Sequence, residues 1–116
     1  RATLASYGTH KLTDIPQEHV TFLEHTRLWW PYDPFLFVHA GVQPGIPVEQ
    51  QSIFTLLWAR NLPPSDDGII QVVGHSPTPN NWPTFEDGRY SMDTGAGHNR
   101  VLTACDVLTR EVWQVS

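Results

Sequence analysis

The sequence predicts an α/β fold, and three observations support that class. Two runs rich in aromatic and β-branched residues, at positions 35–38 and 69–73, each lead into a histidine and a loop containing glycine or proline. Between them, residues 51–60 have the length and apolar content of a helix that packs on a sheet. Further short strand-like runs follow toward the C-terminus. This pattern is typical of an open sheet whose strands end at a ligand-binding crevice.

The first third of the chain predicts a short helix over residues 14–24. Pro16 stands where a first helical turn tolerates proline, acidic residues lie near the start, and apolar residues recur at helical spacing. His19 and His25 lie on or just past this helix among charged neighbours. We therefore assign both histidines to a solvated helix face and expect no ligand role for them.

A β-hairpin is predicted next. Residues 27–30 and 35–38 read as strands, and the intervening Pro-Tyr-Asp-Pro segment at 31–34 is a turn signal. The second strand ends on His39. The following residues, 41–47, contain two glycines and two prolines and predict a rigid loop before the helix.

The second half of the chain is predicted to consist of strands and loops. Residues 66–68 turn into the strand that leads to His75. Residues 76–87 contain three prolines and two adjacent asparagines, and they predict an irregular loop that serves a site or a lid. We expect the tail to form an antiparallel sheet, with strands at 90–93, 101–107 and 111–115 and a tight turn at 108–110.

Composition and charge limit the classes of function. The 116 residues match one ordinary domain, and no apolar run approaches the roughly 20 residues of a membrane span or resembles a secretory signal. The net charge of −5, without a basic cluster, gives no electrostatic footprint for nucleic acid. We expect a cytoplasmic protein without a nucleic-acid or membrane partner. A phosphate-bearing substrate would need a metal ion to attract it.

Cys105 is the only cysteine, which excludes an intrachain disulfide and a thiolate metal cluster. It lies in an alternating apolar and polar run, so we expect a buried strand residue rather than a nucleophile. His39 and His75 are better candidates for chemistry. A single histidine at a strand end is usually a satisfied core or surface residue, but two in the same context favour a metal site.

Four motifs, in this order, resemble those of the calcineurin-like metallophosphoesterases. They are Leu-Phe-Val-His-Ala-Gly-Val-Gln-Pro-Gly at 36–45, Leu-Trp-Ala-Arg at 57–60, Val-Gly-His-Ser-Pro at 73–77 and Met-Asp-Thr-Gly-Ala at 92–96. The branch they resemble is that of bacterial and phage serine/threonine phosphoprotein phosphatases and symmetrical diadenosine tetraphosphatases. Residues 1–8 also look like a segment that those proteins carry upstream.

The resemblance implies a fold and a set of site residues. The fold is a β-sandwich flanked by helices, and the cofactors are two divalent metal ions, manganese first, with iron or zinc as alternatives. His39 and His75 would bind the second ion, and Arg60 would grip the substrate phosphate, although a solvated helix end also explains Arg60. His98 would lie at the rim of the site and touch substrate or water. Asp93 precedes a Thr-Gly turn, and we expect it to cap its own backbone rather than bind metal.

The family's other motifs are missing from this sequence. They are Asp-x-His, Gly-Asp-x-x-Asp-Arg-Gly with the bridging aspartate, and Gly-Asn-His-Glu with the general-acid histidine, and none occurs within residues 1–116. No catalytic residue is therefore assigned in this chain, because a two-metal site needs a bridging carboxylate. Since Arg1 also has no methionine before it, we interpret residues 1–116 as the C-terminal part of a single domain. We expect it to associate with an N-terminal half or with itself.

The leading hypothesis is a metal-dependent hydrolase of phosphate esters or anhydrides, acting on a phosphorylated protein or a dinucleoside polyphosphate. Trp82 and Phe85 could stack on a nucleobase, but packing of their loop is the simpler use. The alternative is a catalytically incomplete scaffold or partner-binding domain that keeps the fold. A zinc-binding module ranks third, because His39 and His75 lack cysteine partners and close spacing.

Overall fold

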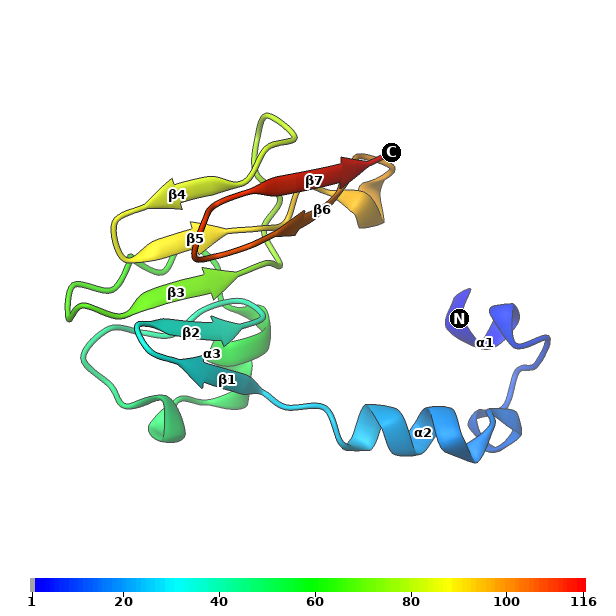
Figure 1. The fold of residues 1–116 in the computed structure, drawn as a ribbon. Coiled ribbons are helices and arrows are strands. Elements are labelled where there is room, and N and C mark those ends of the chain that lie inside the picture. The colour runs from blue at the N-terminus through cyan, green and yellow to red at the C-terminus, as the bar shows by residue number, and fades with distance from the viewer. Residues whose placement is uncertain (1) are drawn as a thin grey trace.

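The computed structural model describes residues 2–116, which form a mixed α and β structure with three α-helices and seven strands in two sheets (Figure 1). In chain order the elements are α1 (Ala2–Ser6), η1 (Leu12–Asp14), α2 (Gln17–Glu24), β1 (Trp29–Tyr32), β2 (Phe35–Val38), η2 (Val48–Gln50), α3 (Ile53–Trp58), β3 (Ile70–Val73), β4 (Thr84–Glu86), β5 (Arg89–Ser91), η3 (Ala96–His98), β6 (Leu102–Cys105) and β7 (Val112–Val115). The α/β class predicted from the sequence agrees with this content.

The larger sheet has the strand order β1-β2-β3-β5-β4. Its three inner strands, β2, β3 and β5, run parallel, while β1 and β4 pair antiparallel at the two edges. The helix α3 lies in the connection from β2 to β3, as expected for a crossover between parallel strands. The carboxyl ends of β2, β3 and β5 therefore meet at one edge of the sheet.

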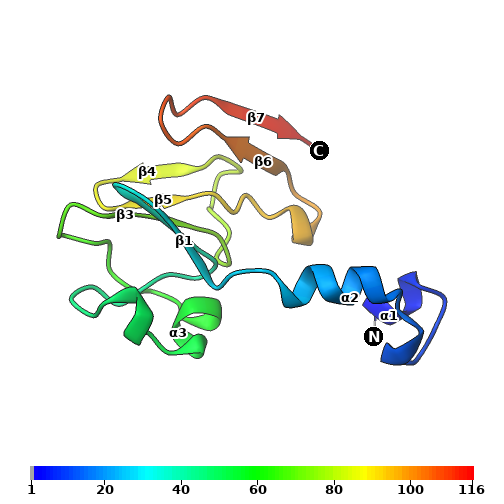
Figure 2. The ribbon, with the colours of Figure 1, turned by 60° about the horizontal axis from the view of Figure 1, so that its bottom comes forward.

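Alternation along the strands gives the larger sheet two apolar faces. One face packs on α3, and its cluster consists of Leu36, Val38, Val42, Leu56 and Val73. The opposite face carries a second cluster, centred on Phe35, Val72 and Tyr90 with Val107 packed against it. In Figure 2 the β6–β7 hairpin lies on the side of the larger sheet opposite α3, so the body is layered as helix, sheet and hairpin.

The two sheets do not close on each other completely. A cavity of about 580 Å³ lies between them and is lined by Phe37, Val72 and Met92 on one side and by Cys105 and Val107 on the other. The polar end of this cavity carries His39 and Asp93. The interior between the sheets is thus partly filled, and the cavity extends to residues that follow the ends of β2, β3 and β5.

Residues 2–26, which we call the arm, extend away from this body (Figures 1 and 2). None of its helical residues is buried, and Phe22 and Leu23 are 72% and 64% exposed. Contacts within the arm stabilise its conformation, including a hydrogen bond of 2.7 Å between the Tyr7 hydroxyl and His19 Nδ1. No helix within residues 2–116 combines the length and the apolar character needed to cross a bilayer.

Several predicted boundaries differ from the structure. The first helix, predicted over 14–24, begins at Gln17, and the second, predicted over 51–60, spans only 53–58. The second helix begins where the Ser52 side chain accepts a hydrogen bond from Thr55 N at 3.0 Å, and it ends because Ala59 is extended. The predicted turn at 31–34 is shorter, since β1 continues through Tyr32.

Two predictions for the second half were wrong. The irregular loop predicted over 76–87 contains β4, which pairs with β5 across a turn at Gly88. The predicted three-stranded antiparallel tail does not exist, because β5 joins the larger sheet beside β3 and only β6 and β7 pair with each other. The tail was mispredicted because β5 pairs with β3, a distant strand that local sequence does not reveal, whereas β4 is only three residues long and forms a strand by pairing with β5.

Candidate functional site

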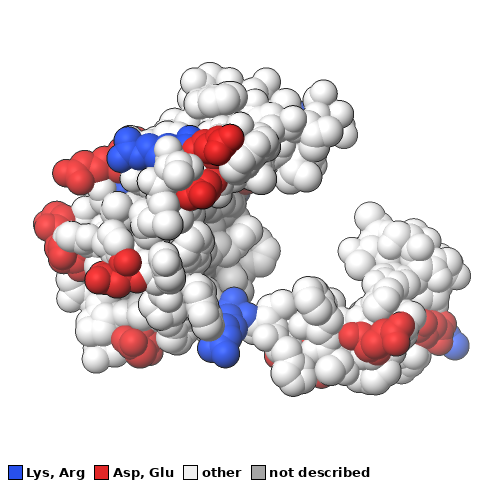
Figure 3. Space-filling model, viewed as in Figure 1, with Lys and Arg blue, Asp and Glu red and all other residues white. Residues whose placement is uncertain are grey.

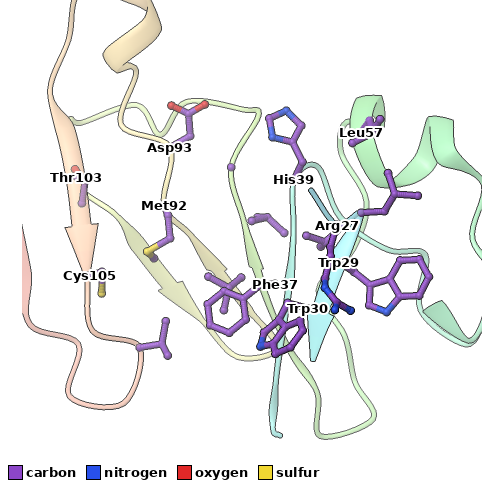
Figure 4. A pocket seen from close by; sticks show the side chains of 16 residues that line it. Arg27, Trp29, Trp30, Phe37, His39, Leu57, Met92, Asp93, Thr103 and Cys105 are labelled. Atoms are coloured by element: carbon purple, nitrogen blue, oxygen red, sulfur yellow. The ribbon is translucent and has the colours of Figure 1, made fainter. Parts of the chain in front are cut away.

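The candidate site lies at the edge where β2, β3 and β5 end. His39 follows β2 directly, and His75 follows β3 after Gly74. Gly74 N donates to the His39 carbonyl at 2.9 Å, and Thr78 N donates to the Asp93 carbonyl at 2.8 Å. The three strand ends are therefore tied to one another through the backbone. Figure 4 shows His39 and Asp93 at the same end of the cavity, with Met92 and Cys105 further along it.

The structure brings His39 and His75 together. His39 Nε2 lies 3.2 Å from His75 Nδ1, and the ring centroids are 5.0 Å apart. His75 has φ of +64°, a left-handed conformation that few residues other than glycine adopt. Such conformations cost free energy and cluster at functional sites. The backbone strain is thus located at the residue that the sequence predicts as a metal ligand.

The donor set of this pair fits neighbouring positions on one metal ion. Metal–imidazole bonds of about 2.0–2.1 Å place two tetrahedral ligand nitrogens about 3.3 Å apart, close to the 3.2 Å between these nitrogens. The same distance also fits a hydrogen bond between two neutral imidazoles, with one ring donating to the other. Within residues 2–116, no group of three or more His, Cys, Asp or Glu side chains is arranged to hold an ion.

Trp58, the last residue of α3, contacts His75 of the pair. Its ring is perpendicular to that of His75, with 5.9 Å between centroids, and 62% of Trp58 remains exposed. His75 Nε2 is buried without a hydrogen-bond partner. Because Nδ1 faces His39, Nδ1 is the His75 nitrogen that is available to a ligand.

Arg60 reaches the same loop from the end of α3. Its Nη1 donates to Ser76 Oγ at 3.5 Å, a long hydrogen bond, and Ser76 is the residue after His75. The Arg60 side chain is exposed, so its remaining N–H groups are accessible to an anion. The structure therefore assembles His39, His75 and Arg60, which are separated by up to 36 residues in the sequence, around one loop.

The other two polar residues considered from the sequence behave differently. Asp93 Oδ1 accepts a hydrogen bond from Gly95 N at 2.8 Å, which confirms the predicted cap of its own turn. His98 is the exposed last residue of η3. Among residues 2–116, no hydrogen bond or ring contact joins His98 to His39, His75 or Arg60, so its role at the rim stays a prediction.

The aromatic residues of the 76–87 segment divide into two kinds. Phe85 packs edge-on against Tyr90, with 5.0 Å between centroids, and belongs to the second core cluster. Trp82 is 48% exposed. Phe85 is therefore used for packing, while the Trp82 indole is accessible to a ligand.

Cys105 is half-buried on the wall of the cavity. Burial raises the pKa of its thiol, and the neighbouring Asp106 carboxylate raises that pKa further. The protonated thiol therefore dominates at neutral pH. Cys105 lies in β6 as the sequence predicts, although it is half-buried rather than buried, and the raised pKa does not favour a nucleophile.

Three residues near the site received no role in the sequence analysis. Trp58 and Ser76 contact the predicted ligand and phosphate-binding residues, and both lie inside motifs that the resemblance uses. Gln71 is completely buried beneath the site. The sequence could have identified Gln71, because it is the only polar residue in the apolar run 69–73. Buried parallel strands are normally apolar throughout.

The chain was compared with known proteins in three ways. No protein-family model, no curated protein and no solved structure matches it. The class of protein therefore has to be inferred from the fold, the geometry of the site and the motifs.

Proposed function

We propose that this chain supplies part of the active site of a metal-dependent hydrolase of phosphate esters or anhydrides, of the calcineurin-like metallophosphoesterase class. The observation that carries the proposal is the approach of His39 Nε2 to His75 Nδ1, at 3.2 Å, with the Arg60 guanidinium bonded to Ser76, the residue after His75. Two nitrogen ligands and a planar fork of donors meet where parallel strands end. This combination suits a phosphate group held between a cation and an arginine.

Each residue has a defined task in this proposal. His39 Nε2 and His75 Nδ1 would hold a divalent ion as neutral imidazoles, with manganese favoured and iron or zinc as alternatives. Arg60 would donate two parallel hydrogen bonds to phosphate oxygens and balance their charge as it grows. A bound pair of ions supplies a nucleophilic water at neutral pH and neutralises phosphoryl charge.

The charge of the molecule supports a role for metal. Acidic side chains are spread over the body and the arm on the face seen in Figure 3, without a large basic patch on that face. Twelve acidic residues against seven basic ones give the chain a net charge of −5. Because the chain is net negative, Arg60 alone would attract a phosphate weakly. A cation bound at the histidine pair would add the positive charge that phosphate binding requires.

The layering of the body supports the finer fold assignment. Two facing sheets with α3 on the outer side of the larger one are what half of a helix-flanked β-sandwich would have. The incompletely filled cavity between the sheets is also consistent with a domain of which residues 1–116 are the C-terminal part.

A second candidate is a partner-binding scaffold that keeps this fold without catalysis. It is favoured by the finding that residues 2–116 contain no cluster of three metal-binding side chains. The two candidates differ in what they predict for the histidine pair: the hydrolase requires it to bind a cation, and the scaffold does not.

A titration with Mn²⁺, followed by NMR of the histidine side chains, tests the proposal on this chain. The chain has six histidines, so four serve as internal references. We expect substoichiometric Mn²⁺ to broaden the signals of His39 and His75 before those of His10, His19, His25 and His98. The variant His75→Ala should abolish the selectivity, and His98→Ala should preserve it.

Equal broadening of all six histidines would contradict the metal site and favour the scaffold. In a longer protein that contains this chain, His75→Ala and Arg60→Ala should each lower manganese-dependent hydrolysis of phosphorylated peptides or diadenosine tetraphosphate. Unchanged hydrolysis in both variants would exclude the proposed roles.

A further inference from the structure

A buried glutamine and a partly buried arginine lie side by side on the face of the larger sheet that packs toward α3. Gln71 of β3 and Arg89 of β5 are register partners on adjacent strands. Gln71 has an exposed fraction of 0%, and burial lowers the pKa of the Arg89 guanidinium. Neither side chain belongs to the site itself.

Gln71 binds two segments at once. Its Oε1 accepts a hydrogen bond from Val42 N at 3.0 Å, which fastens the loop that follows His39. Its Nε2 donates to Ser65 Oγ at 2.9 Å and, over a longer 3.5 Å, to the Pro63 carbonyl, which fastens the segment that follows Arg60. One amide group thus connects the loop of a predicted metal ligand with the segment of the predicted phosphate-binding arginine.

Arg89 strengthens one side of this connection. Its Nη1 donates to the Leu62 carbonyl, and its Nη2 donates to the Pro63 carbonyl at 2.9 Å. Both acceptors lie within three residues of Arg60. Arg89 therefore holds only the Arg60 segment, whereas Gln71 holds both segments.

Gly41 allows the loop after His39 to approach the Gln71 amide. At Gly41, which has φ of +148°, a side-chain Cβ would lie 3.3 Å from Gln71 Oε1 and 3.4 Å from Leu62 Cδ1. The loop after His39 therefore approaches the amide more closely than most residues would permit. A buried amide is costly unless its hydrogen bonds are made, and these are made to two separate segments, which fixes their relative position.

We propose that Gln71, assisted by Arg89, is a positioning residue that sets the spacing between the His39–His75 pair and Arg60. The inference rests on the proposed function, because it concerns the register of a bound cation with the guanidinium. Loss of the Gln71 amide would release the Arg60 segment from the His39 loop without removing a group that contacts metal or phosphate.

The test compares Gln71→Met with Gln114→Met. The control removes a glutamine of β7, in the smaller sheet, whose Nε2 donates to the Asn81 carbonyl and to Thr103 Oγ1 of β6. In the chain loaded with Mn²⁺, paramagnetic broadening of the Arg60 Nε–H signal reports its distance from the ion. We expect Gln71→Met to reduce the Arg60 broadening at least twofold. The His39 and His75 signals should still broaden at the same Mn²⁺ concentration as in the unmodified chain. Gln114→Met should match the unmodified chain, and unchanged Arg60 broadening in Gln71→Met would overturn the inference.

Two further measurements keep the test decisive. If Gln71→Met does not fold, Arg89→Met is used in its place, because the Arg89 variant releases only the Arg60 segment. Reduced Arg60 broadening in Arg89→Met supports the inference, and unchanged broadening overturns it.

If Mn²⁺ does not select the histidine pair in the unmodified chain, the proposed function fails, and the positioning role of Gln71 is tested without metal. Faster exchange of the Val42 amide and loss of the Arg60–Ser76 proximity in Gln71→Met would then support positioning, and retention of both would overturn it.

Discussion

His75 combines a strained backbone with a ring whose contacts are specific. Its φ of +64° is tolerated by histidine, asparagine and aspartate more readily than by most residues, and it is highly unfavourable for β-branched ones. The imidazole packs between His39 and Trp58. Substitutions at position 75 can therefore separate the free-energy cost of the left-handed backbone from the role of the imidazole as a ligand.

We predict that His75→Asn and His75→Val have different effects on stability and the same effect on metal binding. Asparagine accepts the left-handed conformation, so His75→Asn should leave the free energy of unfolding within about 0.5 kcal/mol, whereas His75→Val should lower it by about 1–2 kcal/mol. Urea unfolding measures the difference. Both variants should lose the selective response to Mn²⁺, and equal stability of the two would contradict the strain argument.

At the residue scale, the sequence predicted which side chains are candidates but not how they meet. The positions of His39 and His75 at strand ends followed from apolar runs that stop at loops, and the structure has both strands. Their 3.2 Å approach depends on the parallel pairing of β2 with β3, which no local pattern encodes. Gln71 shows the same limit: its polarity was visible, but its partners come from two distant segments.

Among the elements, the turn between β4 and β5 has the strictest steric requirement. Gly88 has φ of +76°, and a Cβ there would lie 1.9 Å from the Ser65 carbonyl oxygen. Ser65 N in turn donates to the Gly88 carbonyl at 3.3 Å. This turn therefore supports the segment that Gln71 and Arg89 also hold.

We predict that Gly88→Ala lowers the free energy of unfolding by about 3 kcal/mol or more, because backbone atoms would have to move. Gly68→Ala is the matched control, since Gly68 has a similar φ of +86° but open space around the missing side chain. It should cost about 1 kcal/mol, from backbone strain alone. Urea unfolding of both variants measures the contrast, and similar losses would show that the contact with Ser65 yields easily.

Element prediction succeeded where the pattern was local. The β1–β2 hairpin and the β6–β7 hairpin were both anticipated, because each pairs neighbours across a short turn. The strand β4 was missed because Pro83 and two asparagines precede it, and because its three residues form a strand only by pairing with β5. Helix α3 was predicted too long because Ala59 and Arg60 continue its composition but not its conformation.

At the scale of the whole molecule, much apolar surface is exposed. The arm presents Phe22 and Leu23, and the body presents Trp30 and Trp113 at more than half of their accessible area. Large exposed apolar patches mark interaction sites in soluble proteins. These exposed side chains are therefore the part of the molecule where association would bury apolar surface.

We predict that the chain self-associates at micromolar concentration or higher, as measured by sedimentation velocity. The double variant Phe22→Ser with Leu23→Ser should weaken this association, because both side chains lie on α2 and contribute nothing to the buried core. The variant Glu24→Gln, on the same helix, should have no comparable effect. A single monomeric species with a cooperative thermal transition would contradict the prediction.

The strand order also determines at which stage of folding the candidate site forms. The β1–β2 and β6–β7 pairs are local, but β2 pairs with β3 between Phe35 and Ile70, so a long loop must close first. Contacts of this range form slowly because the closure entropy precedes any gain from pairing. His39 and His75 become neighbours only after that step. A metal ion that binds them would therefore act on chains that have already folded, slowing their unfolding without accelerating their folding.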